Sequence, residues 1–250
     1  MNLSGCTALI TGGGTGIGLA LAEALMKEGS QVLICGRREE PLIQAQERFP
    51  GLEYKVCDLA DSADREALFE WVRLKHPGMD LLINNAGVQR DINFRKGLEE
   101  LENGENEVLV NLEASIYLTA QFMPLLLARD EAAIVNVSSG LAFVPLAASP
   151  VYCATKAGLH SFSQSLRHQL SATSVKVFEL IPPAVDTELG RGARARRGET
   201  DRGIPAAEVA AAAVAGIRKD HYEIAVGRAN TLMQGARSDP EGAFKGLNRV

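Results

Sequence analysis

The regular alternation of short apolar runs with longer amphipathic segments is the feature that most constrains the fold of this chain. The runs are rich in Val, Ile or Leu and too short for helices, which indicates strands buried on both faces. Strands that alternate with helices pair in parallel, because the crossover between parallel strands usually holds a helix. We expect strands at Thr7–Ile10, Gln31–Cys35, Glu53–Val56, Leu81–Ile83, Ala133–Val137, Val175–Leu180 and Glu223–Val226. The sequence therefore predicts an α/β fold with one doubly wound, seven-stranded parallel sheet of the Rossmann type and helices on both faces.

Two apolar segments, Asn111–Ala128 and Tyr152–Leu170, have helical spacing and are too long for strands, so we expect helices that pack on one face of the sheet. By contrast, Gly190–Gly203 has no apolar periodicity and concentrates arginines among glycines. We expect residues 188–204 to form a mobile surface loop beside the substrate. This loop either closes over an anionic or carrier-bound substrate or is simply a solvated lid. We expect the chain to end in a short polar tail, Asp239–Val250.

Composition and charge exclude several classes of protein. The chain has 250 residues, 46% of them hydrophobic, and no linker-like stretch divides it, so we expect a single domain over residues 1–250. Its net charge of -5 argues against nucleic acid as the main partner, because binding phosphates requires clustered positive charge. No leader-like N-terminus and no apolar run of membrane-spanning length is present, which indicates a cytoplasmic protein without a membrane partner. Cysteines and histidines lack metal-ligand spacing, so we predict no metal.

A glycine-rich turn, Thr11–Gly18, follows the first predicted strand and opens the first predicted helix. Backbone N–H groups and the helix dipole bind a pyrophosphate at such a place, and glycine lets the ligand approach the backbone. The turn alone is weak evidence, because a tight strand-to-helix connection also uses glycine. The residues expected to contact a dinucleotide here are Gly12, Gly14, Thr15, Gly16, Ile17 and Gly18.

The residues after the second predicted strand indicate which nicotinamide cofactor binds. An NAD-binding fold usually has a carboxylate there, which accepts hydrogen bonds from the ribose 2′-hydroxyl. This chain has Gly36 followed by Arg37 and Arg38, whose guanidinium groups suit a 2′-phosphate. The alternative is that both arginines only form the solvated start of a helix beside Glu39 and Glu40. We expect the cofactor to be NADP(H).

Two further motifs carry chemistry. The sequence Asn-Asn-Ala-Gly ends the fourth predicted strand, where parallel α/β sheets bind ligands, and we expect Asn85, Ala86 and Gly87 to contact the cofactor. Tyr152 and Lys156 lie four residues apart on a predicted helix, so their side chains share one face. A phenol with a pKa of about 10 is a poor base at neutral pH, but a nearby ammonium group favours the phenolate. This pair predicts an acid–base group.

Together these motifs, T-G-x-x-x-G-x-G, N-N-A-G and Y-x-x-x-K in this order, resemble those of the short-chain dehydrogenase/reductase family, from about Leu3 to Thr187. The resemblance implies that Tyr152 exchanges the proton that accompanies hydride transfer and that Lys156 also holds the nicotinamide ribose. It further implies that Ser139, with Ser138 as the alternative, orients the substrate. Asn111 would hold a water that links the lysine to solvent. The same resemblance assigns cofactor contacts to Asp58, Leu59, Pro182, Val185 and Thr187.

One loop departs from the family pattern. The family usually has P-G-x-V-x-T after the sixth strand, whereas this chain has Pro183 in place of the glycine. Proline fixes φ and lacks an N–H, so we expect a different loop geometry beside the nicotinamide amide. The resemblance places the substrate pocket at Gln89, Ser139, Leu141, Phe143 and Ala184.

We therefore predict an NADP(H)-dependent oxidoreductase that interconverts a carbonyl and a secondary alcohol of a small molecule. Several phrases also resemble a bacterial subgroup associated with teichoic-acid D-alanylation genes. The segments Ala206–Gly216 and Glu223–Gly227 resemble those that many relatives use for subunit contacts, which implies a homodimer or homotetramer. One alternative function is a non-catalytic NADP(H)-binding redox sensor or scaffold, which would keep the glycine turn without needing Tyr152. Another is reduction of a carbon–carbon double bond.

Overall fold

The computed structural model describes residues 1–198 and 200–248 and contains one seven-stranded sheet, in which neighbouring strands pair in parallel. The strand order is β3-β2-β1-β4-β5-β6-β7. The strands are β1 (Thr7–Thr11), β2 (Gln31–Gly36), β3 (Glu53–Val56), β4 (Leu81–Asn84), β5 (Ala132–Val137), β6 (Val175–Ile181) and β7 (Glu223–Ala225). Every predicted strand is confirmed, with each end within one residue of its expected place.

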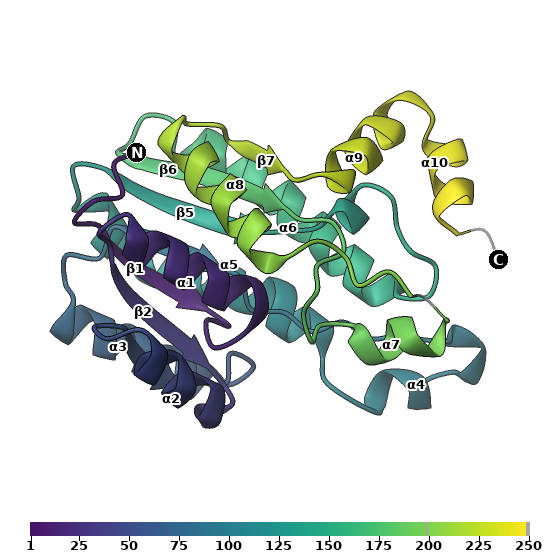
Figure 1. Ribbon diagram of the computed structural model, residues 1–250, viewed down its shortest axis with the longest axis horizontal. Coiled ribbons are helices and arrows are strands. Elements are labelled where there is room, and N and C mark those ends of the chain that lie inside the picture. The colour runs from purple at the N-terminus through teal and green to yellow at the C-terminus, as the bar shows by residue number, and fades with distance from the viewer. Residues whose placement is uncertain (199, 249–250) are drawn as a thin grey trace.

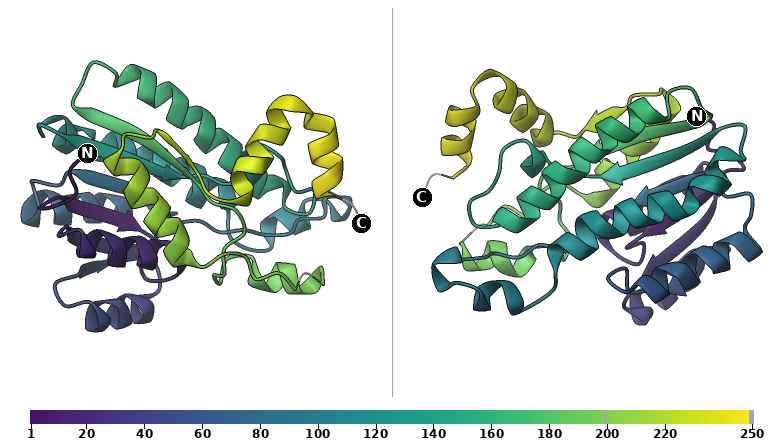
Figure 2. Two further views of the ribbon diagram at one scale, coloured as in Figure 1. Left: turned by 45° about the horizontal axis from the view of Figure 1, so that its top comes forward. Right: turned by 180° about the vertical axis from the view of Figure 1, so that it is seen from behind.

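Helices cover both faces of the sheet, as Figure 1 and Figure 2 show. They are α1 (Gly16–Lys27), α2 (Glu39–Arg48), α3 (Ser62–Lys75), α5 (Ala114–Leu127), α6 (Pro150–Gln169) and α8 (Ala206–Arg218). On one face α1, α2 and α8 bury apolar residues such as Leu25 and Val209. On the other, α3, α5 and α6 bury residues such as Phe122 and Leu166. The expectation that the two long apolar segments pack on the same face is therefore confirmed.

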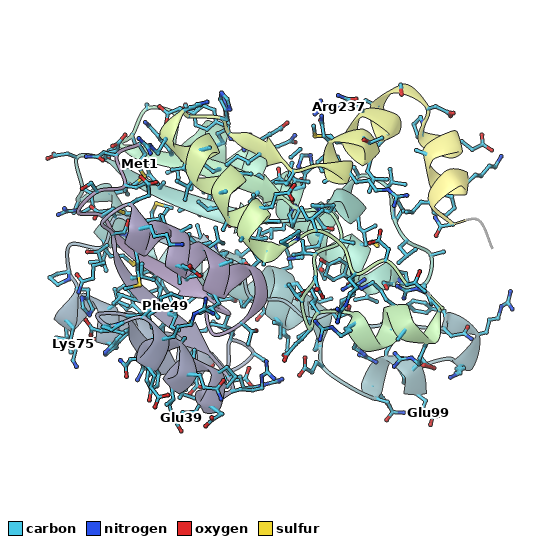
Figure 3. All side chains as sticks on the ribbon, in the orientation of Figure 1. Met1, Glu39, Phe49, Lys75, Glu99 and Arg237 are labelled. Carbon is cyan, nitrogen blue, oxygen red and sulfur yellow. The ribbon has the colours of Figure 1, made fainter. Side chains whose placement is uncertain are left out.

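The carboxyl ends of the strands meet at one edge of the sheet, and the strand order reverses there between β1 and β4. In open α/β sheets this reversal opens a crevice that binds ligands. Short elements extend beyond this edge: two 3-10 turns (Phe94–Lys96, Gly140–Ala142), α4 (Glu99–Glu102), a π-helix (Leu109–Glu113) and α7 (Arg191–Arg196). Figures 1 and 2 show α4 and α7 side by side. In Figure 3 the exposed side chains of Glu39 and Glu99 lie at the rim of the molecule.

The arginine-rich segment differs from its prediction. We expected residues 188–204 to be an irregular loop, but they contain helix α7, and Ile204 forms a β-bridge with Val185. The guanidinium group of Arg194 donates hydrogen bonds to the main-chain oxygens of Val185 and Leu189, and Ala193 is buried. A helix held by hydrogen bonds and ion pairs of its arginine side chains leaves no apolar period in the sequence, so periodicity could not reveal it. Residue 199 lies outside the described residues.

The end of the chain also differs from its prediction. Two helices that the sequence analysis did not identify, α9 (Arg228–Ser238) and α10 (Pro240–Leu247), follow β7, so the expected polar tail is largely helical. Asn248 accepts a hydrogen bond from the N–H of Ala147 at 2.7 Å, which fixes α10 against the chain after β5. Residues 249–250 lie outside the described residues. Across the described residues, no helix combines the length and apolarity needed to cross a membrane.

Candidate active site

The glycine turn between β1 and α1 forms a cradle that side chains would fill. Gly12 and Gly16 adopt positive φ values of 63° and 54°, which favour glycine. A Cβ atom on Gly18 would lie 2.2 Å from the main-chain oxygen of Gly12. Thr15 caps α1 in an extended conformation, so the helix N-terminus opens toward the crevice. The turn therefore has the close backbone approach that only glycine permits.

A cavity of about 220 Å³ extends from this turn along the carboxyl ends of the strands. It is lined by most of the residues predicted for cofactor binding and catalysis: Gly12, Thr15, Gly16, Ile17, Arg37, Asp58, Leu59, Asn85, Ala86, Gly87, Tyr152, Lys156, Pro182 and Thr187. A neighbouring hollow adds Gly14 and Arg38. Gly18 lies behind the turn, and the side chain of Val185 packs in the core, so neither lines these two hollows.

The loop after β4 is bonded directly to the glycine turn. Thr11 Oγ1 accepts hydrogen bonds from the main-chain N–H groups of Asn85 and Ala86 at 2.9 and 3.0 Å. The side-chain amide of Asn85 donates in return to the main-chain oxygens of Thr11 and Gly12. The sequence analysis missed Thr11, although its position directly before the glycines was a signal. Asn84 holds the adjoining strand β5 by donating to Asn136 Oδ1 at 2.9 Å.

The two arginines predicted to select the cofactor lie at the end of the cavity and contact carboxylates. Arg37 pairs with Glu105, and Arg38 donates to Glu188 Oε2 at 2.8 Å. All four side chains are at least 38% exposed. Exposed ion pairs contribute little to stability, so these guanidinium groups remain able to exchange a carboxylate for a phosphate.

Tyr152 and Lys156 are buried on one face of α6, at the wall of the cavity. Lys156 Nζ lies 5.7 Å from the centroid of the Tyr152 ring and donates a hydrogen bond to the main-chain oxygen of Val137 at 2.8 Å. A Cβ atom on Gly87 would lie 3.6 Å from this Nζ, which shows how closely the Asn-Asn-Ala-Gly loop approaches the lysine. The helical spacing of four residues therefore brings both groups to the cofactor cavity, as predicted.

Burial controls the ionisation of both groups. It raises the pKa of Tyr152 to about 12, while a hydrogen-bonding contact with Ser139 acts in the opposite direction. Burial also lowers the pKa of Lys156 to about 8. The sequence analysis expected the lysine to favour the phenolate, but the loss of solvation dominates because both groups are inside the protein. At neutral pH Tyr152 therefore carries its proton.

The two candidate serines differ in what their hydroxyl groups do. Ser138 Oγ donates to Glu179 Oε1 at 2.5 Å, so its proton is already engaged. Ser139 Oγ accepts a hydrogen bond from the N–H of Leu141 at 3.1 Å and contacts Tyr152. An oxygen that accepts from the backbone keeps its own O–H for another acceptor. These hydrogen bonds leave the O–H of Ser139 available, whereas Ser138, and not Ser139, lines the cavity.

Asn111 is completely buried within the π-helix that precedes α5. Its side-chain amide donates to the main-chain oxygen of Val88 at 2.9 Å and to Thr155 Oγ1 at 3.1 Å, and its Oδ1 accepts from the N–H of Val88. It therefore joins α6 to the loop after β4. A π-helix within an α-helix often accompanies a functional site.

The substrate side is defined less well than the cofactor side. None of the residues predicted for the substrate pocket lines the two hollows that the described residues form; they are Gln89, Ser139, Leu141, Phe143 and Ala184. Ser138, the alternative to Ser139, does line the cavity. The lining instead includes residues that the sequence analysis did not select: Gly36, Cys57, Val88, Val110, Val137, Glu188 and Leu189. Within the described residues no cluster of His, Cys, Asp or Glu is arranged to hold a metal ion.

Known proteins are similar to this chain in sequence over most of its length. The family model for short chain dehydrogenases matches residues 6–198. The uncharacterized oxidoreductase DltE of Bacillus subtilis is 47% identical over 99% of this chain and 98% of its own length. An uncharacterized oxidoreductase of Staphylococcus saprophyticus is 30% identical over 78% of this chain and 82% of its own. The DltE match confirms the predicted subgroup.

A solved structure agrees with these relatives. A short chain dehydrogenase of Burkholderia cenocepacia in complex with NADP superposes with a TM-score of 0.85, at 26% identity over 99% of both chains. A short chain dehydrogenase/reductase of Burkholderia phymatum, in complex with NAD, gives the same TM-score at 21% identity over 100% of this chain and 98% of its own. The chain therefore belongs to the short-chain dehydrogenase/reductase family of oxidoreductases.

Proposed function

We propose that this chain is an NADP(H)-dependent oxidoreductase that interconverts a carbonyl and a secondary alcohol, with Tyr152 as the general acid and base. The observation that carries the proposal is the meeting of Tyr152 and Lys156 with the glycine turn in one cavity. Ser139 also acts on the phenol, because it lowers the pKa of Tyr152 against the effect of burial. A bound nicotinamide dinucleotide would supply or accept the hydride. The chain itself supplies binding, orientation and the proton.

The residues present fit such a dinucleotide. The glycine turn leaves the backbone bare at a helix N-terminus, which suits a pyrophosphate. Arg37 and Arg38 suit a 2′-phosphate, and no carboxylate occupies the end of β2, where NAD-binding folds usually have one. The NADP complex of the Burkholderia cenocepacia relative supports this choice of cofactor. We infer that NADP(H) is preferred over NAD(H).

The side chains also fit the reaction. A carbonyl oxygen placed between Ser139 and Tyr152 would accept one hydrogen bond from each hydroxyl, and the negative charge that develops there would be stabilised as the hydride arrives. Tyr152 then transfers its proton to that oxygen. Lys156 keeps a positive charge near the phenol, and Asn111 fixes the loop that faces both.

We also propose that the protein is a homodimer or homotetramer. Large apolar side chains are exposed along α5 and the turn before it, namely Val108, Ile116, Tyr117 and Leu127. Apolar side chains that gather on one helix suit a contact with a second copy. Light scattering of the purified protein tests this expectation.

The proposed function is tested by binding and turnover in sequence. NADPH should raise the melting temperature more than NADH at equal concentration, because ligands stabilise in proportion to affinity. NADPH oxidation should then be followed with a panel of carbonyl compounds. Tyr152→Phe should lower kcat by about 10²–10⁴-fold and leave the NADPH-induced melting shift intact. Tyr54→Phe, on the edge strand β3, is the matched control and should change neither.

Two outcomes would overturn parts of the proposal. If NADPH binds but wild type turns over no carbonyl or alcohol, the chain is a cofactor-binding sensor rather than an enzyme. If neither dinucleotide binds, the role assigned to the glycine turn is wrong.

A further inference from the structure

Glu179 is a fully buried carboxylate directly beneath the active site. It lies on β6 beside Asn136 of β5 and is 0% exposed. Its Oε1 accepts the hydrogen bond from Ser138 Oγ at 2.5 Å, and its Oε2 lies 2.7 Å from Nδ1 of His160. A buried carboxylate is costly unless it is paired, and here both oxygens have partners. None of the catalytic roles described above uses this group.

The partners of Glu179 hold both ends of the segment that carries Ser139. Ser138 directly precedes Ser139, and Glu179 fixes it from below. At the far end, the ring of Phe143 packs on the ring of His160, with centroids 4.6 Å apart and planes at 60°. The 3-10 turn between these ends begins with the hydrogen bond from the N–H of Leu141 to Ser139 Oγ. The direction of the Ser139 hydroxyl therefore depends on a turn anchored at both ends.

His160 also connects this anchor to the catalytic helix. It follows Lys156 by one helical turn of α6, and Lys156 Nζ bonds to Val137, the residue before Ser138. Glu223 of β7 raises the pKa of His160 and Arg167 of α6 lowers it, and both effects are smaller than that of Glu179. The lysine, the serine segment and the buried pair thus form one continuous set of contacts between α6, β5 and β6.

We propose that Glu179 and His160 are positioning residues that orient Ser139 toward Tyr152 by fixing the Ser138–Phe143 segment from both ends. This inference rests on the proposed function for its catalytic consequence, although Ser139 lowers the pKa of Tyr152 without any substrate present. The plain alternative is that the pair only stabilises the fold. The two ideas differ in whether the environment of Tyr152 changes when the Glu179–His160 pair is removed.

The experiment uses ¹³Cζ-tyrosine NMR of the full-length protein, with the Tyr152 signal assigned by its absence in Tyr152→Phe. Ser139→Ala defines the shift caused by losing the serine contact. Glu179→Gln, which keeps the size of the side chain, and His160→Phe, which keeps a ring against Phe143, should move the Tyr152 signal in the same direction. Ser138→Ala serves as the milder variant if either of these fails to fold.

Ser163→Ala is the matched control for stability. Ser163 is fully buried on the same helix and accepts a hydrogen bond from Asn136, but it does not touch the serine segment. It should lower the melting temperature without moving the Tyr152 signal. Kinetics give a second measurement. Glu179→Gln should reduce kcat about tenfold and change the Kd of NADPH by less than twofold, because the substitution acts on the proton donor and not on the cofactor.

The inference is overturned if Glu179→Gln, His160→Phe and Ser138→Ala leave the Tyr152 signal in place while lowering the melting temperature as Ser163→Ala does. If the Tyr152 signal moves but wild type has no turnover, the positioning role stands and the proposed function fails instead. The NMR measurement thus tests the positioning role separately from the proposed function.

Discussion

Thr11 and Asn85 bond to each other in both directions: the main-chain N–H of Asn85 donates to Thr11 Oγ1, and the Asn85 side chain donates to the Thr11 main-chain oxygen. This pair joins the glycine turn to the loop that faces Lys156. The glycine turn and this loop, which line the cavity together, are therefore held to each other by hydrogen bonds.

Thr11→Val should weaken both stability and cofactor binding. Thr11 is buried, and valine would leave the N–H groups of Asn85 and Ala86 without their acceptor. A buried donor without a partner costs about 1–3 kcal/mol, which denaturant unfolding would measure. Calorimetry should show weaker NADPH binding. The control is Thr7→Val, because the Thr7 hydroxyl makes only one long hydrogen bond, to Gln31 at the exposed end of β1. This variant should change neither stability nor NADPH affinity. Equal losses of stability and affinity in both variants would contradict the prediction.

The carboxylates that contact the two arginines should compete with a 2′-phosphate. Glu188→Gln removes the partner of Arg38, so we expect NADPH affinity to rise a few-fold at low salt while NADH affinity stays constant. Arg38→Gln should do the reverse and reduce NADPH affinity alone. Arg48→Gln, at the other end of α2 and paired with Glu23, is the control. Calorimetric titrations with NADPH and NADH measure these affinities. If the variants change the NADH affinity as much as the NADPH affinity, the arginines do not select the cofactor through its 2′-phosphate.

The strands and the cofactor motifs could be predicted because their signals are local. A parallel strand buried on both faces needs an unbroken apolar run, and a glycine turn or a Y-x-x-x-K pair lies within a few residues. Thr11 directly precedes the glycines, but its hydrogen-bond partners could not be predicted in the same way, because they are more than 70 residues away. Those partners meet it only when β1 pairs with β4.

Glu179 shows the limit more clearly. One acid within the apolar strand β6 gives no hint of a partner, because Ser138 and His160 come from β5 and α6 and meet it only through strand register. Short helices such as α7 are likewise fixed by tertiary contacts rather than by their own pattern, since a helix of so few residues is unstable alone. The sequence therefore identified most of the residues that line the cavity, but not the residues that support them from outside it.

The direction of the reaction should depend on pH through Tyr152 and Lys156. Because the pKa of Tyr152 is raised to about 12, the phenol is protonated at neutral pH, and carbonyl reduction should be favoured there. Alcohol oxidation needs the phenol to lose its proton, so its rate should rise with pH. Reduction should decline above pH 8, because the lowered pKa of Lys156, about 8, means that its charge is lost there. Rates of both reactions measured from pH 6 to 10 check the rise in oxidation and the decline in reduction.

Lys156→Arg identifies the group behind the decline in reduction. Arginine stays charged throughout this range, so the residual activity of the variant should no longer fall near pH 8. A decline that persists unchanged in Lys156→Arg would assign it to another group.

His160 should make stability depend on pH near neutrality. Its hydrogen bond to Glu179 raises the pKa of His160 above the ordinary 6.5, so the folded protein holds this proton more tightly than the unfolded chain does. The resulting stabilisation is fully present below pH 6.5 and is lost as the pH rises through the folded pKa. The free energy of unfolding of wild type relative to His160→Gln should therefore be largest at mildly acidic pH and shrink as the pH rises. His168→Gln, on the exposed end of the same helix, is the control. A difference that instead grew with pH would mean that the folded protein holds His160 neutral.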